Sequence, residues 1–395
     1  MKNGLLIFLV ALPSFAFSQV DFNQGIIVQK NFCDTIPIEY VREKILIPVV
    51  INGENKKFLF DTGATLIISE QIQSKMKNKK YGKIKVTDIY KRETFQTCVK
   101  VEEIQIGKLI FQNTPSLVLD QETSGLLSCY QYDGVIGSNL LRNCIFQLDL
   151  EKKILILTDK IENLNTRNAF QTLLKTLDKQ NSPFLEINFD NKIKFDAQFN
   201  TGNADFISIS KEISDKSLKA GISKVINYGF ATTTNSSETY KTKIERIMFD
   251  NIQFRDAKIS NFVSYVYFYD NTYNHVGVEL AEYGTVTIDF INKRFYFAAK
   301  ETKQFYKYQK TIGFNVTFFE DQYLIISVMK GSPAEKNGLK NGYQVLKFND
   351  LDVSKPSSEI DCKLYLTKPV SRASKVKVTY KNYFGKTKTV ELTEE

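Results

Sequence analysis

One pattern occurs twice in the sequence, and it predicts the fold of both halves. Residues 45–69 read ILIPVVINGENKKFLFDTGATLIIS, and residues 182–210 read SPFLEINFDNKIKFDAQFNTGNADFISIS. Each contains an apolar strand, a short polar turn, a second apolar strand, a Thr-Gly dipeptide and another β-rich run. The alternation of Val, Ile and Phe with polar residues, around turns such as Asn52-Gly53 and Asp190-Asn191, predicts β-structure in both stretches.

A second pair of stretches repeats at the same spacing. Residues 133–157 read DGVIGSNLLRNCIFQLDLEKKILIL, and residues 274–297 read NHVGVELAEYGTVTIDFINKRFYF. Asn200 follows Asp61 by 139 positions, and Gly277 follows Gly137 by 140. A constant offset over several landmarks predicts two homologous lobes of about 140 residues. We expect mainly β-structure, with short helices at residues 70–80, 161–179 and 211–220.

Composition limits the classes of function. The chain has 395 residues, of which 43% are hydrophobic and 25% charged, as in folded proteins with two or three units. The net charge is +9, but Lys and Arg are interleaved with acidic residues, so no nucleic-acid partner is expected. The single histidine, His275, argues against a His-rich metal site, and we expect no metal and no cofactor.

The five cysteines do not form a recognisable framework. They lie at positions 33, 98, 129, 144 and 362, with no CxxC pair. An oxidising compartment would permit disulfides, although an odd count leaves one thiol unpaired or intermolecular. We expect most of these cysteines to be buried thiols, and the sequence does not choose a pairing.

The first residues predict an export signal. Lys2 precedes the apolar run Leu5–Leu12, which is too short to span a bilayer, and small residues lead to a cleavage site after Ser18. No cysteine follows that site to carry a lipid anchor. Residues 1–18 are therefore the expected signal peptide of a periplasmic or secreted protein without a membrane anchor after cleavage.

The Asp-Thr-Gly turn at residues 61–63 carries a resemblance to a known family. An apolar strand precedes it, a β-rich run follows it, and the apolar-apolar-Gly step Val135-Ile136-Gly137 lies farther on. Over roughly residues 40–300 the chain resembles the aspartic peptidases, both the bilobed pepsin-like and the half-size retroviral-type enzymes. This resemblance implies two six-stranded β-barrel lobes with a central cleft that binds a polypeptide substrate.

The family's chemistry requires two carboxylates. They share one proton and hold the water that attacks the peptide carbonyl. The resemblance assigns the first catalytic position to Asp61 and the second to Asn200. An amide cannot shuttle a proton, so we expect hydrolysis to be impaired. The expected supporting residues of the active-site loops are Thr62, Gly63, Thr201, Gly202, Ile136 and Gly137.

The resemblance also implies a flap over the cleft, but it does not single out one aromatic residue for it. The family's flap should lie between residues 80 and 100, with Tyr81, Tyr90 or Phe95 as its aromatic contact. His275, which replaces an apolar residue of the second apolar-Gly step, is expected to be a satisfied structural histidine. Pairing of Asp61 with Asp61 of a second copy is an alternative, although the second lobe competes for the same surface.

Residues 310–395 resemble a PDZ domain of the type found in bacterial proteases. The stretch GSPAEKNGLKNG at residues 331–342 predicts a short helix that begins after Ser332 and Pro333 and ends at Gly338. The resemblance implies that backbone N–H groups of Ile312, Gly313 and Phe314 bind a peptide C-terminus, with a helix near residues 357–366 as the groove's other wall. Tyr343 departs from the usual Asp.

These features give the expected organisation and three functional hypotheses. Residues 1–18 are the signal peptide, 19–160 and 161–305 the two lobes, and 306–395 a PDZ domain of β-strands with two short helices. The chain, expected to be a monomer, is an active endopeptidase, an inactive peptide-binding relative, or a scaffold in which the PDZ domain alone binds peptides. The pair Asp61 and Asn200 favours impaired or absent catalysis.

Overall fold

The structure, a computed structural model, consists mainly of β-strands, as the sequence predicts. It describes residues 20–76, 80–87, 93–119, 129–189, 192–235, 238–254, 257–268, 273–300, 304–306, 312–319, 322–355, 357, 360, 362–364 and 375–394. The expected signal peptide and the turn at Asp190-Asn191 lie outside these residues. None of the helices in the described ranges is both long and apolar enough to span a membrane.

The first repeat forms a sheet of nine strands. These are β1 (Ile26–Ile27), β3 (Glu39–Val41), β4 (Lys44–Ile51), β5 (Glu54–Phe60), β6 (Ile67–Ser69), β7 (Lys80–Thr87), β8 (Glu93–Ile106), β9 (Leu109–Leu119) and β10 (Gly134–Ile136). Asn52 and Gly53 have φ of 54° and 75° in the turn between β4 and β5, as an Asn-Gly hairpin turn requires. The predicted helix at 70–80 is a shorter α1 (Glu70–Ser74), which Ser69 caps.

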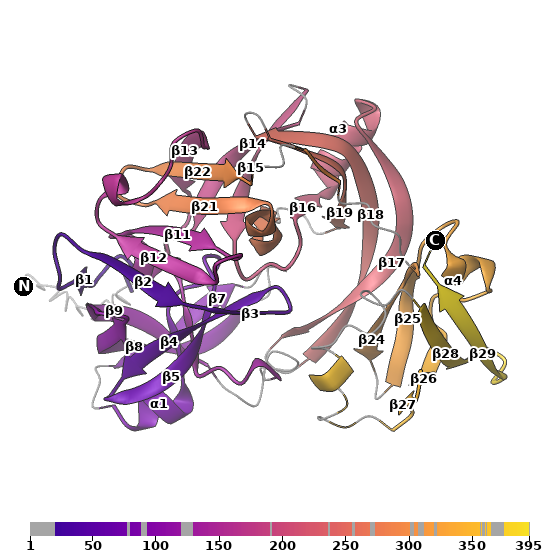
Figure 1. The fold of residues 1–395 in the computed structure, drawn as a ribbon. Coiled ribbons are helices and arrows are strands. Elements are labelled where there is room, and N and C mark those ends of the chain that lie inside the picture. The colour runs from indigo at the N-terminus through magenta and orange to yellow at the C-terminus, as the bar shows by residue number, and fades with distance from the viewer. Residues whose placement is uncertain are drawn as a thin grey trace, which may run out of the picture.

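The second repeat contains the equivalent strands. They are β14 (Pro183–Phe189), β15 (Ile193–Asn200), β16 (Ile207–Ser210), β17 (Ser223–Asn235), β18 (Glu238–Phe254), β19 (Ala257–Tyr267) and β20 (Asn274–Gly277). The helix predicted at 211–220 is confirmed as α3 (Lys211–Lys219), with the Ser210 hydroxyl accepting from the N–H of Ile213. In Figure 1, β17 and β18 are long curved strands that lie between the rest of the second repeat and the C-terminal elements.

The two repeats also share their hydrogen-bonding register. β10 runs parallel to β5 with Ile136 opposite Phe60, and β20 runs parallel to β15 with Val276 opposite Phe199. β10 is also antiparallel to β6, as β20 is to β16. The equivalent residues are 139 or 140 positions apart, the same offsets as in the sequence.

A six-stranded layer joins the repeats. Its order is β2 (Cys33–Pro37), β12 (Ile154–Thr158), β11 (Ile145–Asp149), β21 (Gly284–Asp289), β22 (Arg294–Ala299) and β13 (Phe170–Thr176). At its centre Gln147 lies opposite Thr287, and Gln147 Nε2 donates to Thr287 Oγ1 at 2.9 Å. Equivalent residues therefore meet at the middle of this layer, where a local twofold axis relates the repeats.

One predicted helix is wrong. Within residues 161–179 the structure has a single 3-10 turn, Ile161–Asn163, and then the strand β13. β13 pairs with β22 just as β2 pairs with β12, so it is the second repeat's copy of β2. The ladder with β22 outweighs the helical preference of the Gln, Leu and Lys residues in this segment.

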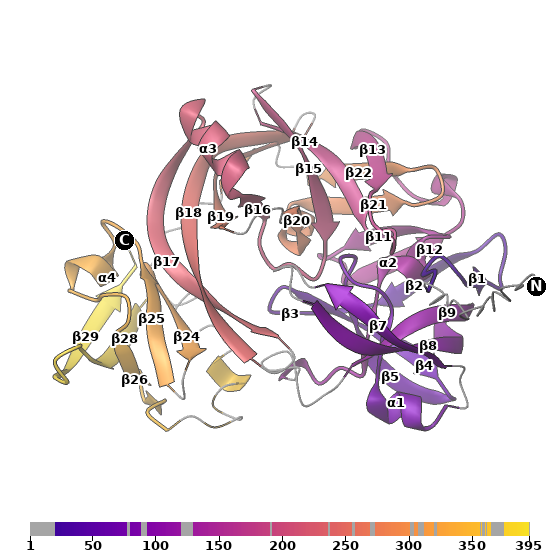
Figure 2. The same cartoon turned by 180° about the vertical axis from the view of Figure 1, so that it is seen from behind.

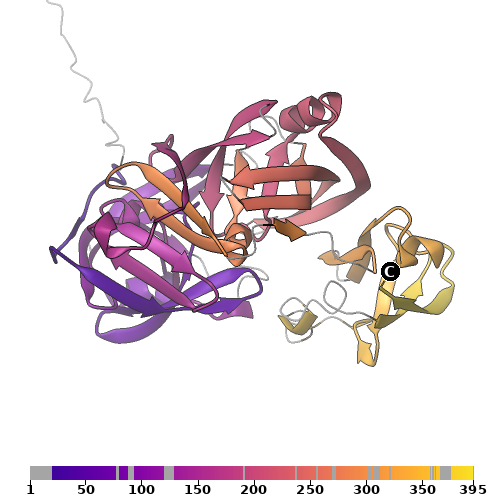
Figure 3. The same ribbon diagram turned by 45° about the horizontal axis from the view of Figure 1, so that its top comes forward.

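Residues 312–394 form a third unit with a hydrophobic core of its own, around side chains such as Phe314, Ile325 and Val378. Its elements are β24 (Phe314–Phe319), β25 (Gln322–Val328), α4 (Pro333–Lys336), β26 (Gln344–Phe348), β27 (Leu351–Asp352), β28 (Lys375–Lys381) and β29 (Thr387–Thr393). The unit lies beside β17 in Figures 1 and 2, and the tilted view in Figure 3 shows it set apart from the six-stranded layer.

Among the described residues, a strand pairing and a disulfide connect the third unit to the repeats. Gly229 of β17 pairs with Ser327 of β25, and a disulfide joins Cys129 to Cys362. The expectation that most cysteines are buried thiols is wrong, because it holds only for Cys98 and Cys144. The remaining cysteine, Cys33, is free and exposed.

Candidate functional site

Asp61 lies directly after β5, in a loop that β10 holds from one side. Phe58 and Phe60, near the end of the strand, are fully buried, and the N–H of Asp61 donates to Ile136 O at 3.0 Å. In the second repeat, Asn200 is the last residue of β15 and lies opposite Gly277 of β20. Equivalent strands of the two repeats therefore end at these two side chains and position them in the same way.

Thr62 and Thr201 join the two loops by reciprocal hydrogen bonds. Thr62 Oγ1 donates to Phe199 O at 2.6 Å and accepts from the N–H of Thr201 at 3.1 Å. Thr201 Oγ1 donates to Phe60 O at 2.9 Å and accepts from the N–H of Thr62 at 3.0 Å. Both threonines are fully buried, so losing either hydroxyl would leave polar backbone groups unpaired. The four bonds fix the two loops against each other.

This arrangement brings Asp61 and Asn200 to one junction between the repeats. Asp61 Oδ1 accepts from the N–H of Gly63 at 2.8 Å, and Asn200 Oδ1 accepts from the N–H of Gly202 at 2.7 Å. A β-carbon at Gly63 would collide with the Asn200 carboxamide, and one at Gly202 would collide with the Asp61 carboxylate. Each side chain therefore packs against the glycine of the opposite loop, which only a residue without a side chain permits.

The junction holds one ionisable carboxyl and one neutral amide. Burial raises the pKa of Asp61, while the Lys44 ammonium and the N–H groups of Gly63, Gly202 and Ala64 oppose that rise. With its oxygen directed at the loop N–H groups, Asn200 presents Nδ2 toward the opposite glycine. Of the two facing side chains, Asp61 is an acceptor and Asn200 a donor, and only Asp61 can take up or release a proton.

Two further side chains cross between the repeats to the glycine carbonyls. Lys44, at the start of β4, donates to Gly202 O. Gln180, just ahead of β14, donates to Gly63 O at 2.8 Å. Neither residue is among the predicted site residues. Both stand at or immediately before the first strand of their repeat's hairpin, but a single sequence does not show that they cross the junction.

The apolar-Gly steps lie against the two loops. A β-carbon at Gly137 would collide with the backbone of Ala64 and Thr65, and one at Gly277 with the backbone of Asp205. Ser138, next to Gly137, extends the contact: its N–H donates to Ala64 O at 3.0 Å and its hydroxyl to Thr62 O at 2.6 Å. The structure thus places the predicted supporting residues Ile136 and Gly137 beside the Asp61 loop.

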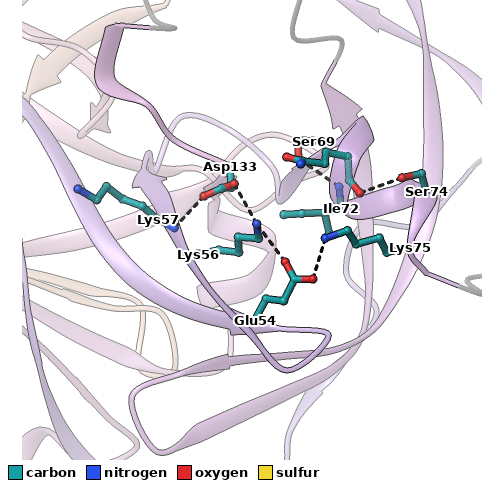
Figure 4. Close-up of polar contacts among 9 residues, drawn as sticks. Glu54, Lys56, Lys57, Ser69, Ile72, Ser74, Lys75 and Asp133 are labelled. Atoms are coloured by element: carbon teal, nitrogen blue, oxygen red, sulfur yellow. Dashed lines mark hydrogen bonds and ion pairs between the residues drawn. The ribbon is translucent and has the colours of Figure 1, made fainter.

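A polar network connects β5 to the residue before β10 (Figure 4). The carboxylate of Asp133 accepts from the N–H of Lys57 at 3.1 Å, and Lys56 Nζ lies 3.6 Å from it. Lys56 also pairs with Glu54 at 3.2 Å, and Lys75 pairs with Glu54 at 2.7 Å. Partly exposed pairs of this kind add little stability individually. Within this network, only the contacts of Lys56 and Lys57 with Asp133 link β5 to the segment before β10.

His275 is buried without a hydrogen bond at one ring nitrogen. The residue is 6% exposed, and within the described ranges Nε2 has no hydrogen-bond partner. The prediction of a satisfied histidine is therefore wrong. Burial lowers the pKa of His275 to about 4, so the ring is neutral at pH 7 and lies behind the Asn200 loop, between β15 and β16.

The expected flap falls on the hairpin of β7 and β8 (Figure 2). Tyr81 donates to Gln24 Oε1 at 3.3 Å, toward the N-terminal segment. Tyr90 lies outside the described residues. Phe95 is 69% exposed, so of the two described candidates it is the one whose ring is available to a ligand.

The predicted peptide-terminus residues lie at the entrance to β24. Ile312 and Phe314 are buried, and Gly313 has a φ of 87°, a conformation that favours glycine. Their carbonyls bind the segment around α4, with the N–H of Met329 donating to Gly313 O at 2.7 Å and that of Ala334 to Ile312 O at 3.1 Å.

The helix predicted after Ser332 is confirmed as α4, which Ser332 caps and which ends before Gly338 at a φ of 77°. Residues 360 and 362–364 are helical, in the region expected to form a groove wall. Tyr343 is explained by packing, because its ring stacks on Tyr380 at 5.3 Å and meets Tyr383 edge-on.

Comparison with known proteins finds a protein-family match within the first repeat. Residues 47–140 match the family model described as "Aspartyl protease", which indicates a peptidase-like protein; the matched stretch includes Asp61 but not Asn200. Among solved structures 391 chains match. One is the crystal structure of basic 7S globulin from soybean, with 10% identity, a TM-score of 0.43, and coverage of 68% of this chain and 95% of that chain. The comparison with curated proteins finds no match.

Within the described ranges no group of three or more His, Cys, Asp or Glu side chains is placed to hold a metal ion.

Proposed function

We propose that this chain is an exported, peptidase-like protein that binds an extended polypeptide between its two repeats and cleaves it slowly or not at all. The observation that carries the proposal is the reciprocal pair Thr62 and Thr201, which places Asp61 and Asn200 at one junction. The aspartyl protease match over residues 47–140 supports the same assignment.

Impaired hydrolysis follows from the chemistry of the two side chains. Water attack on a peptide bond needs a base to take a proton from water and an acid to protonate the leaving amine. Asp61 can perform one of these roles at a time, and Asn200 can perform neither. Asn200 Nδ2, which also donates to Gln198 Oε1 at 3.4 Å, and the Asp61 carboxylate are the proposed donor and acceptor for a peptide backbone, so binding does not require the missing acid.

The third unit is proposed to be a PDZ domain that adds a second contact for the polypeptide. Its separate core, the left-handed Gly313 before β24 and the capped helix α4 support this assignment. A C-terminal carboxylate would bind at the N–H groups of residues 312–314, and its chain would extend β24 as an added strand. A scaffold that uses this groove alone is the second candidate function.

The test uses a mixed peptide library with the full chain, its Asp61→Asn variant and a pepstatin-type competitor at pH 3–7. Binding that the competitor displaces, without cleavage products, supports the proposal. Rapid cleavage that Asp61→Asn abolishes would show an active endopeptidase instead. Binding displaced only by peptides with a free C-terminal carboxylate would favour the scaffold.

A further inference from the structure

We propose that Lys44 is a positioning residue for Asp61 and favours its ionised form, the acceptor that a ligand would meet at the junction. This inference deepens the proposed function and rests on it for the role of Asp61 as a ligand contact. In a pair of carboxyls, a shared proton offsets one of the two negative charges. Here we assign that role to the positive charge of Lys44.

The geometry places the ammonium on the glycine loop that packs against the carboxylate. Lys44 Nζ donates to Gly202 O, and the α-carbon of Gly202 packs directly against the Asp61 carboxylate. The hairpin that carries Lys44 is itself held across the junction, because Tyr40 OH donates to Glu282 Oε1 of the second repeat at 2.7 Å. Tyr130 OH also donates to Arg42 O at 3.1 Å, at the tip of the same hairpin.

The equivalent contact from the second repeat to the first shows that a positive charge is not needed to hydrogen-bond the glycine carbonyl. Gln180 makes the same kind of bond to Gly63 O with a neutral amide. Gly63 packs against neutral Asn200, whereas Gly202 packs against Asp61. The charged crossing residue thus bonds the glycine that packs against the carboxylate, and the neutral one bonds the glycine that packs against the carboxamide. This match is expected if the charge of Lys44 serves Asp61.

The surrounding charges agree with this assignment. Among the strongest influences on Asp61, Lys44 is the one charged side chain, and it lowers the pKa that burial raises. The other contributions come from backbone N–H groups, and Asn200 and Gln180 are neutral. Further acidic groups of the interface act on neighbouring tyrosines; they are Glu43, Asp205, Glu279 and Glu282.

The experiment follows the titration of Asp61 by carbon NMR in full-length protein labelled at aspartate carboxyls, with the signal assigned by its loss in Asp61→Asn. Lys44→Gln mirrors Gln180: it keeps a donor for Gly202 O and removes the charge. We expect it to raise the titration midpoint of Asp61 by about 1 pH unit or more. Lys44→Arg, which keeps the charge, should leave the midpoint within a few tenths of a unit.

Gln180→Leu is the matched control, since it removes a crossing hydrogen bond without changing any charge. A midpoint that Lys44→Gln leaves unchanged would overturn the proposal, as would an equal shift in Gln180→Leu, which would indicate a purely structural effect. The titration needs no peptide. A failure of peptide binding would therefore refute the proposed function without affecting the test of Lys44.

Discussion

Gln147 and Thr287 lie opposite each other at the centre of the six-stranded layer, although 140 residues separate them in the sequence. Their hydrogen bond joins equivalent positions of the two repeats, so the local twofold axis passes between them. The same symmetry relates the loops of Asp61 and Asn200. The fold is therefore close to symmetric, while the chemistry at the junction is not.

The threonine pair should contribute measurably to stability. In Thr62→Val the side chain keeps its shape but leaves Phe199 O and the N–H of Thr201 without their buried partner. Leaving such groups unpaired costs about 1–3 kcal/mol each. We expect a lower free energy of unfolding in urea, with Thr62→Ser close to the wild type because it keeps the hydroxyl. Equal stability of the Val and Ser variants would contradict the role given to these bonds.

His275 should make the protein sensitive to acid. Its pKa falls from an ordinary 6.5 to about 4 in the folded protein, so the folded state disfavours the charged ring. The stabilisation is complete above about pH 6.5 and is lost as the pH falls toward 4, a change of about 3 kcal/mol. Unfolding measured at pH 7, 5.5 and 4 should show this loss.

The control for that prediction is His275→Gln, which cannot titrate. Its free energy of unfolding should fall less between pH 7 and pH 4 than that of the wild type. Parallel pH dependences for the two proteins would mean that the histidine is not held in its neutral form by burial.

The disulfide should hold the third unit against the repeats. Removing it with Cys129→Ser leaves the strand pairing of Gly229 with Ser327 as the described backbone link between β17 and β25. A native disulfide typically contributes about 2–4 kcal/mol. We expect faster hydrogen exchange in β17 and β25, measured by mass spectrometry. Cys33→Ser, at a free and exposed cysteine, is the matched control, and equal exchange in both variants would refute the prediction.

The sequence predicts the repeated parts of this fold well, because they depend on local patterns. Alternating apolar residues, the Asn52-Gly53 turn and the Ser332 cap each specify their structure within a few residues. The strand β13 is not predicted, for the opposite reason: its residues favour a helix, and it becomes a strand only by pairing with β22, more than 100 positions away.

The candidate site is predictable only in part. Asp61 and Asn200 stand out by their motifs, and the offset of 139 positions identifies them as equivalent residues of the two repeats. Lys44 and Gln180 cannot be found in this way, because their contacts cross the junction between the repeats. The disulfide between Cys129 and Cys362 likewise depends on the placement of the third unit, which no local pattern specifies.

The claim that the amide of Asn200 limits catalysis is tested most directly by comparing how fast the wild type and Asn200→Asp cleave one bound peptide. Restoring a second carboxyl beside Asp61 supplies the missing proton carrier, which typically contributes about 10²–10⁴-fold. We predict a gain of that order, abolished when Asp61→Asn is added. A wild type that cleaves as fast as Asn200→Asp, in a reaction that depends on Asp61, would contradict the claim that the amide limits catalysis.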